Sequence, residues 1–314
     1  MKKIIVPIFL LVFLAACSGK LIKTSKLNGK VRTVKETRYD VIEGNGEIIK
    51  ERVSSGYSPT MSVYDKKGNL IEENTYDNLQ DTLQRKYVCK YDEKGNMIEF
   101  NGYDSKGASL RKYVFKYDEK GNEIELRYYD LDGSLTNRVF KYDEKGNKIE
   151  QSKYNSDGNL SSRKIYKNDN KGNLIEESVY GSDGSLFYRL IYKYDKKRHL
   201  IEQSQYNSND NLDRTWLYKY DDKGNQIEES RYNSGGNLEN KEVYKYDKKG
   251  NEIERSSYNG DGNLEYRCTC KYDAKNNWVT KIEYGYEYED DDDNILDVPI
   301  PVPETITIRE IEYF

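Results

Sequence analysis

The sequence is poor in the residues that most enzymes place at reactive centres. Its 314 residues include one histidine, four cysteines, two tryptophans and five prolines. The histidine, His199, lies in the turn-like stretch 196–199, and no neighbouring residue completes a catalytic triad. The glycines are evenly spread and form no phosphate-binding loop. We therefore expect no enzyme activity, no cofactor and no metal centre.

The chain also lacks a concentration of charge of one sign. It has 51 basic and 55 acidic residues, interspersed throughout, which argues against nucleic acid as a partner. Hydrophobic residues make up only 35% and charged residues 34%, so we expect no thick core. High charge alone could indicate disorder, but 31 tyrosines and a strict periodicity indicate an ordered chain.

A long apolar run occurs only near the start. Lys2 and Lys3 precede an apolar stretch, 4–16, that is too short to span a bilayer comfortably and is typical of an export signal. The stretch ends in Leu-Ala-Ala-Cys17, which resembles the lipobox of bacterial lipoproteins. That resemblance implies cleavage before Cys17, lipidation of Cys17, and anchoring in the cell envelope. We expect the outer membrane, with its side left open; the alternative is ordinary secretion with Cys17 as a thiol.

The main signal is a repeat in which Tyr-Asp is followed by Gly-Asn. The successive markers are spaced by 27, 26, 25, 26, 26, 26, 26 and 26 residues. Arg198 and Asn276 occupy the glycine position in two units, and the glycines themselves are Gly68, Gly95, Gly121, Gly146, Gly172, Gly224 and Gly250. Such regular self-similarity is typical of a repeat protein.

A second marker, a tyrosine that leads into another turn, lies between the first ones. These tyrosines are Tyr103, Tyr129, Tyr154, Tyr180, Tyr206, Tyr232 and Tyr258. Each 26-residue unit therefore holds two turns and two segments of about eight residues, which is a hairpin pattern.

The segments alternate as strands do. Pairing Tyr117 with Asn122 across one turn would place Phe115 opposite Ile124, an aromatic residue opposite an aliphatic one. The Phe115 position is filled elsewhere by Cys89, Phe140, Tyr166, Tyr192, Tyr218, Tyr244 and Cys270, and the Ile124 position by Ile71, Ile98, Ile149, Ile175, Ile201, Ile227, Ile253 and Val279. We expect two apolar ladders on one face, with rows of lysines and glutamates on the other.

One spacing does not fit simple alternation. Ile124 and Tyr129 are five residues apart and would point to opposite faces. Either tyrosines lie on both faces, or a β-bulge shifts every second strand.

The predicted fold is all-β: an antiparallel meander of about 16–18 strands, forming an elongated or curled twisted single sheet. We expect a signal peptide at 1–16, a lipidated cysteine and tether at 17–27, an N-terminal β cap at 28–63, repeats at 64–283, and an acidic loop with a capping strand at 284–314. Terminal segments must differ from the repeats because an exposed sheet edge recruits other chains.

The turns resemble the YD repeats of Rhs-type proteins, most clearly at 91–96 and 142–147. The resemblance implies a β-sheet shell, associated with surface interaction, carbohydrate binding or enclosure of a toxin. With so few repeats, we do not expect enclosure.

The candidate functional residues are few. Lipidation is predicted at Cys17, and ligand contacts are predicted at the seven tyrosines of the second marker. Cys89, Cys268 and Cys270 are expected to be small apolar fillers. The acidic run 287–293 is expected to be a solvated loop, with calcium binding left open.

The leading hypothesis is a non-catalytic envelope lipoprotein whose sheet binds or scaffolds protein partners. The alternatives are a glycan-binding module that uses the tyrosines, and, less favoured, an enzyme acting on polysaccharide.

Overall fold

The computed structural model describes residues 27–44, 47–52, 57–287 and 300–314, and every regular element in them is a β-strand. The strands are β1 (Val31–Gly44), β2 (Glu47–Arg52), β3 (Thr60–Tyr64), β4 (Leu70–Tyr76), β5 (Leu83–Tyr91), β6 (Met97–Asp104), β7 (Ser109–Tyr117), β8 (Glu123–Tyr129), β9 (Leu135–Tyr142), β10 (Lys148–Tyr154), β11 (Leu160–Asn168), β12 (Leu174–Gly181), β13 (Leu186–Tyr194), β14 (Leu200–Asn207), β15 (Leu212–Tyr220), β16 (Gln226–Asn233), β17 (Leu238–Tyr246), β18 (Glu252–Asn259), β19 (Leu264–Tyr272), β20 (Trp278–Glu287) and β21 (Ile300–Tyr313). No helix of these residues is long and apolar enough to cross a membrane.

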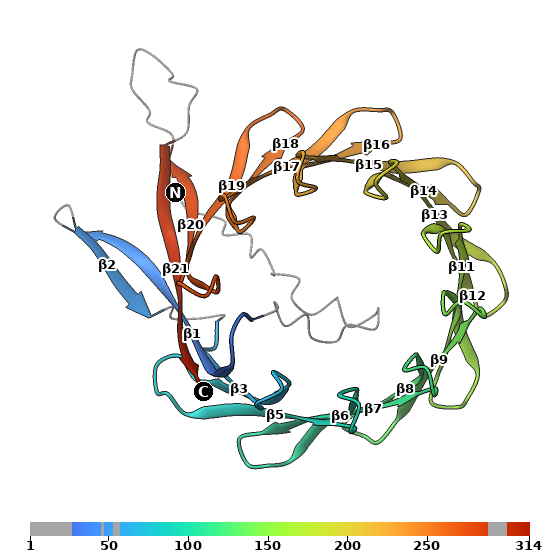
Figure 1. The fold of residues 1–314 in the computed structure, drawn as a ribbon, viewed down its shortest axis with the longest axis horizontal. Coiled ribbons are helices and arrows are strands. Elements are labelled where there is room, and N and C mark those ends of the chain that lie inside the picture. Colours follow the sequence, from blue (N-terminus) through green and yellow to red (C-terminus); the bar gives the residue numbers. More distant parts are fainter. Residues whose placement is uncertain (1–26, 45–46, 53–56, 288–299) are drawn as a thin grey trace, which may run out of the picture.

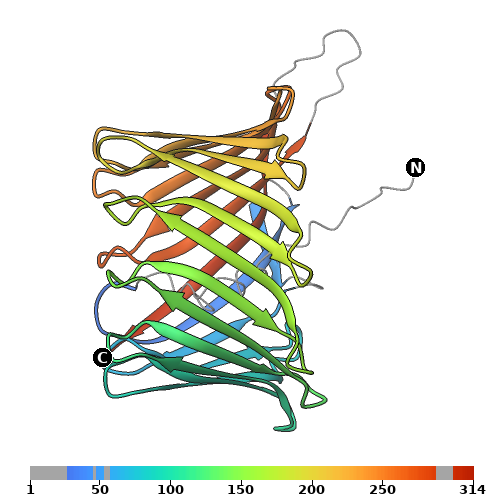
Figure 2. The same cartoon turned by 90° about the vertical axis from the view of Figure 1, so that its right-hand side faces the viewer.

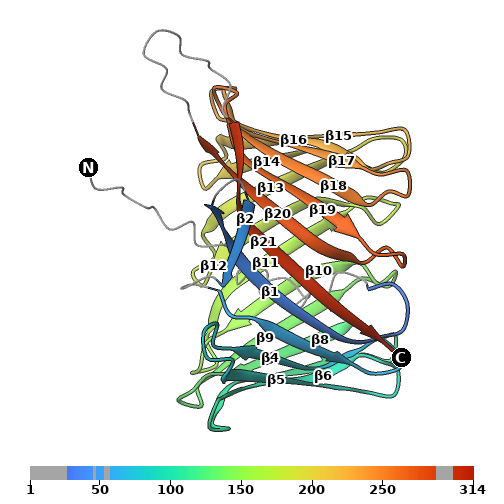
Figure 3. The same ribbon diagram turned by 90° about the vertical axis from the view of Figure 1, so that its left-hand side faces the viewer.

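The sheet closes into a ring, so the predicted elongated or curled single sheet was wrong. From β3 to β21 each strand pairs antiparallel with the next, and β1 pairs with both β3 and β21. The result is a 20-stranded antiparallel β-barrel, with β2 forming a hairpin on β1 beside it. Figure 1 shows the closed ring, and Figures 2 and 3 show its tilted strands.

The two segments expected to cap the sheet instead join each other. β1 and β21 pair over nine positions, from Val31 opposite Tyr313 to Asp40 opposite Thr305. The chain is also held where it enters β1, because the backbone N–H of Asn28 donates to Asn277 Oδ1 at 2.7 Å. Closure removes both sheet edges, which capping would only have covered.

The Tyr-Asp…Gly-Asn turns owe their repetition to local hydrogen bonds. In the turn after β15, Asp221 Oδ1 accepts the backbone N–H groups of Lys223 (3.0 Å) and Asn225 (2.8 Å), and Oδ2 accepts the Asn225 side chain (2.9 Å). Gly224 has a φ of 87°, a conformation that favours glycine. Arg198 and Asn276 hold the same left-handed conformation, with φ values of 71° and 62°.

A bulge at the start of the even-numbered repeat strands resolves the spacing problem and corrects the predicted register. Phe115 pairs with Leu126 and Lys116 with Glu125, while Tyr117 pairs with Glu123. Ile124 is therefore the extra residue of a bulge, which is the second of the two sequence-based alternatives. The first alternative also holds, because Tyr113 shares a face with Phe115 and Tyr129 stands opposite Lys112 on the other face. The predicted pairing of Phe115 with Ile124 was wrong.

The bulge divides the side chains into two walls. One face carries Phe115 and Leu126, and the other carries Lys116, Ile124 and Glu125. The buried apolar cluster belongs to the first face and includes Val34, Tyr64, Leu70, Tyr87, Cys89, Phe100, Phe115, Leu126 and Phe140. Closing a sheet crowds side chains on its concave side, so this face is the inner wall and the other is the outer wall.

The isoleucines of the bulges lie on the outer wall, so the second predicted apolar ladder does not share a face with the first. They remain partly exposed, at 36% for Ile124 and 38% for Ile201.

The barrel is too wide for its inner side chains to fill. Twenty strands about 4.8 Å apart and tilted by about 40° enclose a ring roughly 40 Å across between backbones. In agreement, no large side chain of the described residues is less than 2% exposed. The inner wall therefore surrounds a space that its own side chains do not fill.

Candidate functional site: the inner wall of the barrel

The tyrosines of the Tyr-Asp turns join neighbouring repeats at one rim. Tyr246, at the end of β17, donates its hydroxyl to the carbonyl of Gln226, at the start of the neighbouring strand β16, at 2.7 Å. The same bond to a carbonyl one repeat earlier is made by Tyr91, Tyr117, Tyr142, Tyr194, Tyr220 and Tyr272. These tyrosines are structural, because their polar ends are used within the wall.

One sector of the inner wall, on β5 to β9, is apolar and aromatic. The ring of Phe100 lies 5.4 Å from that of Tyr87 and 5.7 Å from that of Tyr113, and Tyr113 lies 4.8 Å from Tyr128. Contacts of this geometry stabilise a sheet by about 0.5–1.5 kcal/mol each. The rings pack against one another across four strands and form a continuous surface.

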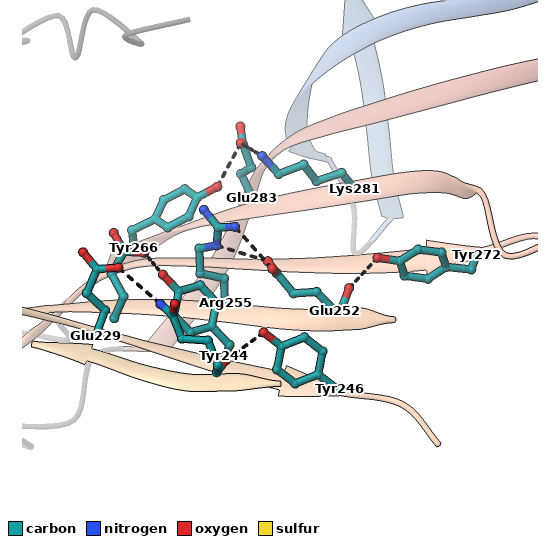
Figure 4. A network of polar contacts seen from close by, with 11 residues as sticks. Glu229, Tyr244, Tyr246, Glu252, Arg255, Tyr266, Tyr272, Lys281 and Glu283 are labelled. Atoms are coloured by element: carbon teal, nitrogen blue, oxygen red, sulfur yellow. Dashed lines mark hydrogen bonds and ion pairs between the residues drawn. The ribbon is translucent and has the colours of Figure 1, made fainter. Parts of the chain in front are cut away.

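The sector on β16 to β20 is instead a polar network, shown in Figure 4. Arg255 binds both carboxylate oxygens of Glu252, at 3.1 and 3.3 Å, and its guanidinium lies 5.1 Å from the centre of the Tyr244 ring. Tyr244 in turn donates its hydroxyl to Glu242 at 2.6 Å. Planar groups held in this way keep a fixed orientation.

A second cluster extends the network to β1 and β21, whose pairing closes the barrel. Glu283 accepts hydrogen bonds from Tyr266 (3.0 Å), Lys281 (2.7 Å), Arg38 (2.6 Å) and Thr305 (2.9 Å). These partners come from β19, β20, β1 and β21, so the cluster forms only when the barrel is closed.

Burial and neighbouring charges shift the pKa values on this wall. Burial, aided by the hydrogen bond to Glu242, raises the pKa of Tyr244. Burial likewise raises the pKa of Glu229. At Glu283 burial opposes ionisation, but the hydrogen bond and charge of Lys281 and the charge of Arg38 hold its pKa below the ordinary value.

The outer wall is a regular band of ion pairs. Lys193 lies 2.8 Å from Glu202 and Lys219 2.8 Å from Glu228, and the lysines are about 60% exposed. The equivalent pairs are Lys90–Glu99, Lys116–Glu125, Lys141–Glu150, Lys167–Glu176 and Lys245–Glu254. Hydrogen bonds from Lys90 and Asn101 lower the pKa of Glu99 to about 2.

The seven candidate tyrosines lie in a row around the outer wall and do not form a compact site. Each stands opposite a residue of the outer face, as Tyr129 does opposite Lys112. Arg189 lies 5.3 Å from the ring centre of Tyr206, and Lys241 5.0 Å from that of Tyr258. Ligand binding by this row stays a prediction.

The remaining predicted residues are placed as follows. Cys17 and residues 288–293 of the acidic run lie outside the described residues. His199 fills the asparagine position of its turn and contacts Asp195 through Nδ1 at 3.0 Å. Cys89, Cys268 and Cys270 are free thiols of the inner wall. Among the described residues, no group of three or more His, Cys, Asp or Glu side chains is placed to hold a metal ion.

The polar network was not predicted from the sequence, because periodicity identifies the residues that the repeats share. The residues of the network occupy positions at which the repeats differ. The inner-wall position of Leu126 is filled in order by Glu73, Phe100, Leu126, Gln151, Glu177, Gln203, Glu229, Arg255 and Lys281. The outer position one residue before it is a glutamate in all units but the last, where Thr280 stands.

No family model and no curated protein matches the chain. Among solved structures, TcdB2-TccC3 without its hypervariable C-terminal region matches at 14% identity and a TM-score of 0.33, covering 80% of this chain and 16% of its own. A porin-like protein from Bacteroides uniformis matches at 10% identity and a TM-score of 0.38, covering 91% of this chain and 98% of its own. The Photorhabdus luminescens Tc holotoxin pore matches at 12% identity and a TM-score of 0.20, over 74% of this chain and 16% of its own.

Proposed function

We propose that this chain is a non-catalytic lipoprotein of the bacterial cell envelope, anchored through Cys17, whose barrel binds a protein partner on its inner wall. The observation that carries the proposal is the contrast between the two walls. The outer wall repeats the same lysine–glutamate pair around the ring, whereas one inner position holds acidic, basic, amide, aliphatic and aromatic side chains. A position that holds the same residue in every repeat is explained by the fold that the repeats share. A position that differs between repeats is explained by contacts specific to each place on the wall.

The composition of the outer wall favours a barrel that is exposed to water and attached to the membrane by a lipid. A barrel wall that faces lipid carries an apolar band about 25 Å tall, and a lysine or arginine at its midplane costs about 2–4 kcal/mol. Here charged pairs run around the wall, with lysines about 60% exposed. Such a wall requires a separate means of membrane attachment, and a lipidated Cys17 would provide it.

The inner wall has the composition of a protein-binding surface. Aromatic residues and arginine are enriched at protein interfaces and dominate their binding energy. The inner wall presents Tyr192 of β13, Trp216 of β15, and Tyr244 and Arg255 of β17 and β18. Arg255 is held in place by two hydrogen bonds. A ring roughly 40 Å across leaves space for an α-helix, which is about 10–12 Å wide. The partner is therefore a polypeptide segment that enters the barrel.

Site-specific photo-cross-linking tests this proposal on one strand. A benzophenone side chain replaces Gln203, on the inner wall of β14, or Ile201, two residues earlier on the outer wall. Partner adducts in envelope extracts are expected from position 203 and not from position 201. Adducts from position 201 alone would place the binding site on the outer wall and contradict the proposal. Binding of a glycan that depends only on the outer tyrosines would favour the alternative function, a glycan-binding module.

The anchor is tested separately. Cys17→Ser is expected to move the protein from the membrane to the soluble fraction after cell lysis, because a serine offers no sulfur to which the proposed lipid could be attached. Retention of the variant on membranes would contradict the anchor while leaving the inner-wall proposal standing.

A further inference from the structure

Two cysteines lie side by side on the inner wall, outside the polar contacts that the proposed function uses. Cys268 and Cys270 are two residues apart on β19, so their side chains point to the same face. Cys268 is 4% exposed and Cys270 is half-buried. In the neighbouring strands, Cys268 stands opposite Arg255 and Glu283, and Cys270 stands opposite Lys281.

Their spacing does not suit a disulfide. Residues i and i+2 of a strand place their Cβ atoms about 6.8 Å apart, whereas a disulfide needs about 3.5–4.5 Å. A single metal ion with bonds of about 2.3 Å to each sulfur spans about 4.6 Å, which this pair reaches by side-chain rotation alone.

Cationic side chains lie on both sides of the pair. Arg255 of β18 stands opposite Cys268, and Lys281 of β20 stands opposite Cys270. Thiolates are soft ligands that select ions such as Cu(I). Two thiolates around a monovalent ion carry a net charge of −1 beside Arg255 and Lys281, which are themselves paired with Glu252 and Glu283, whereas zinc in a structural site is bound by four ligands.

We propose that Cys268 and Cys270 form a two-coordinate site for a monovalent soft metal ion, with Cu(I) as the ion tested. Binding forms two sulfur–copper bonds and releases the thiol protons to water. The copper is already Cu(I), so no electron is transferred and no oxidant or reductant takes part.

The test titrates Cu(I) into the reduced, full-length protein in detergent without oxygen, in competition with a chromogenic Cu(I) chelator. The wild-type protein is expected to hold one equivalent more than the Cys268→Ser/Cys270→Ser double variant. Each single variant is expected to weaken binding by at least about tenfold, the scale on which metal sites respond even to loss of a supporting group.

Cys89→Ser is the matched control, because Cys89 fills the same strand position as Cys270 but has no cysteine two residues away. It is expected to leave Cu(I) binding unchanged. Equal uptake by the wild-type and double-variant proteins, or equal loss in the Cys89 variant, would overturn the proposal. Circular dichroism of each variant establishes that it is folded, and the cross-linking experiment above is independent of the result.

Discussion

At the residue scale, the repeated motif is a set of hydrogen-bonding roles, each tied to one side chain. The tyrosine joins one repeat to the carbonyl of the previous one. The aspartate holds the turn backbone, the glycine supplies the left-handed conformation, and the asparagine returns a side-chain bond to the aspartate. Because each role needs a particular chemical group, the motif recurs with little change.

Tyr246→Phe tests the first of these roles. Removing the hydroxyl leaves the Gln226 carbonyl without this donor, and we expect the free energy of unfolding to fall by about 1 kcal/mol, measured by urea denaturation. Tyr232→Phe, in the outer row, is the control and is expected to change stability by less than about 0.5 kcal/mol. Equal effects would mean that the rim bonds contribute nothing specific.

The turn aspartates predict how stability depends on pH. Hydrogen bonds from the Asn225 side chain and backbone lower the pKa of Asp221 in the folded state, and the pKa is lowered in all nine turns, at Asp65, Asp92, Asp118, Asp143, Asp169, Asp195, Asp221, Asp247 and Asp273. A depressed carboxyl pKa adds stability above the unfolded-state value of about 4, and this stability is lost as the pH falls through the folded-state pKa.

We therefore expect the urea midpoint to change little between pH 7 and 5 and to fall steeply below about pH 4. Burial raises the pKa of Glu73, Glu123 and Glu229, so these three add stability as the pH falls, but the nine aspartates outnumber them. Asp221→Asn should make the acid decline shallower. A midpoint that is unchanged at pH 3 would contradict this account.

At the element scale, the bulge decides which side chains of a strand are inside. In β8, Leu126 is 5% exposed on the inner wall, whereas Ile124, two residues earlier, is 36% exposed on the outer wall. Without the bulge, these two residues would share a face.

Paired substitutions in β8 test this register. Leu126→Ala is expected to lower the free energy of unfolding by about 2–4 kcal/mol, because it removes buried contacts with Phe115. Ile124→Ala is expected to cost less than half as much. A larger loss at Ile124 than at Leu126, in the same denaturation assay, would reverse the assignment of the two walls.

At the scale of the whole molecule, closure depends on the pairing of β1 with β21, which are more than 260 residues apart in the chain. Deleting residues 300–314 would expose the edges of β1 and β20, and unpaired edges recruit other chains. We expect the deletion variant to form aggregates or oligomers in light scattering. Deleting Phe314 alone, which is 50% exposed, is the control and should leave the protein monodisperse. A monodisperse 300–314 deletion would show that closure is dispensable.

Much of the local structure could be predicted from the sequence, because it depends on neighbours in the chain. The hairpin turns, the strand lengths, the two-turn unit and the lysine–glutamate rows follow from spacing and residue type, as in the unit 113–129. The bulge was recognised as one of two alternatives, but its position was not, since Ile124 looks like an inward residue by composition alone. The inner-wall network was not predicted, because Arg38, Tyr266 and Glu283 meet only through strand pairing.

The sequence by itself determined that the protein is an antiparallel chain of hairpins with alternating faces, because turn hydrogen bonds and side-chain alternation act over a few residues. Only the tertiary structure decided that the sheet closes, which face is the inside, and that β19 places two cysteines beside Arg255 and Lys281. Those outcomes depend on small twists added over twenty strands and on a match between two distant ends, and neither quantity is visible in any single repeat.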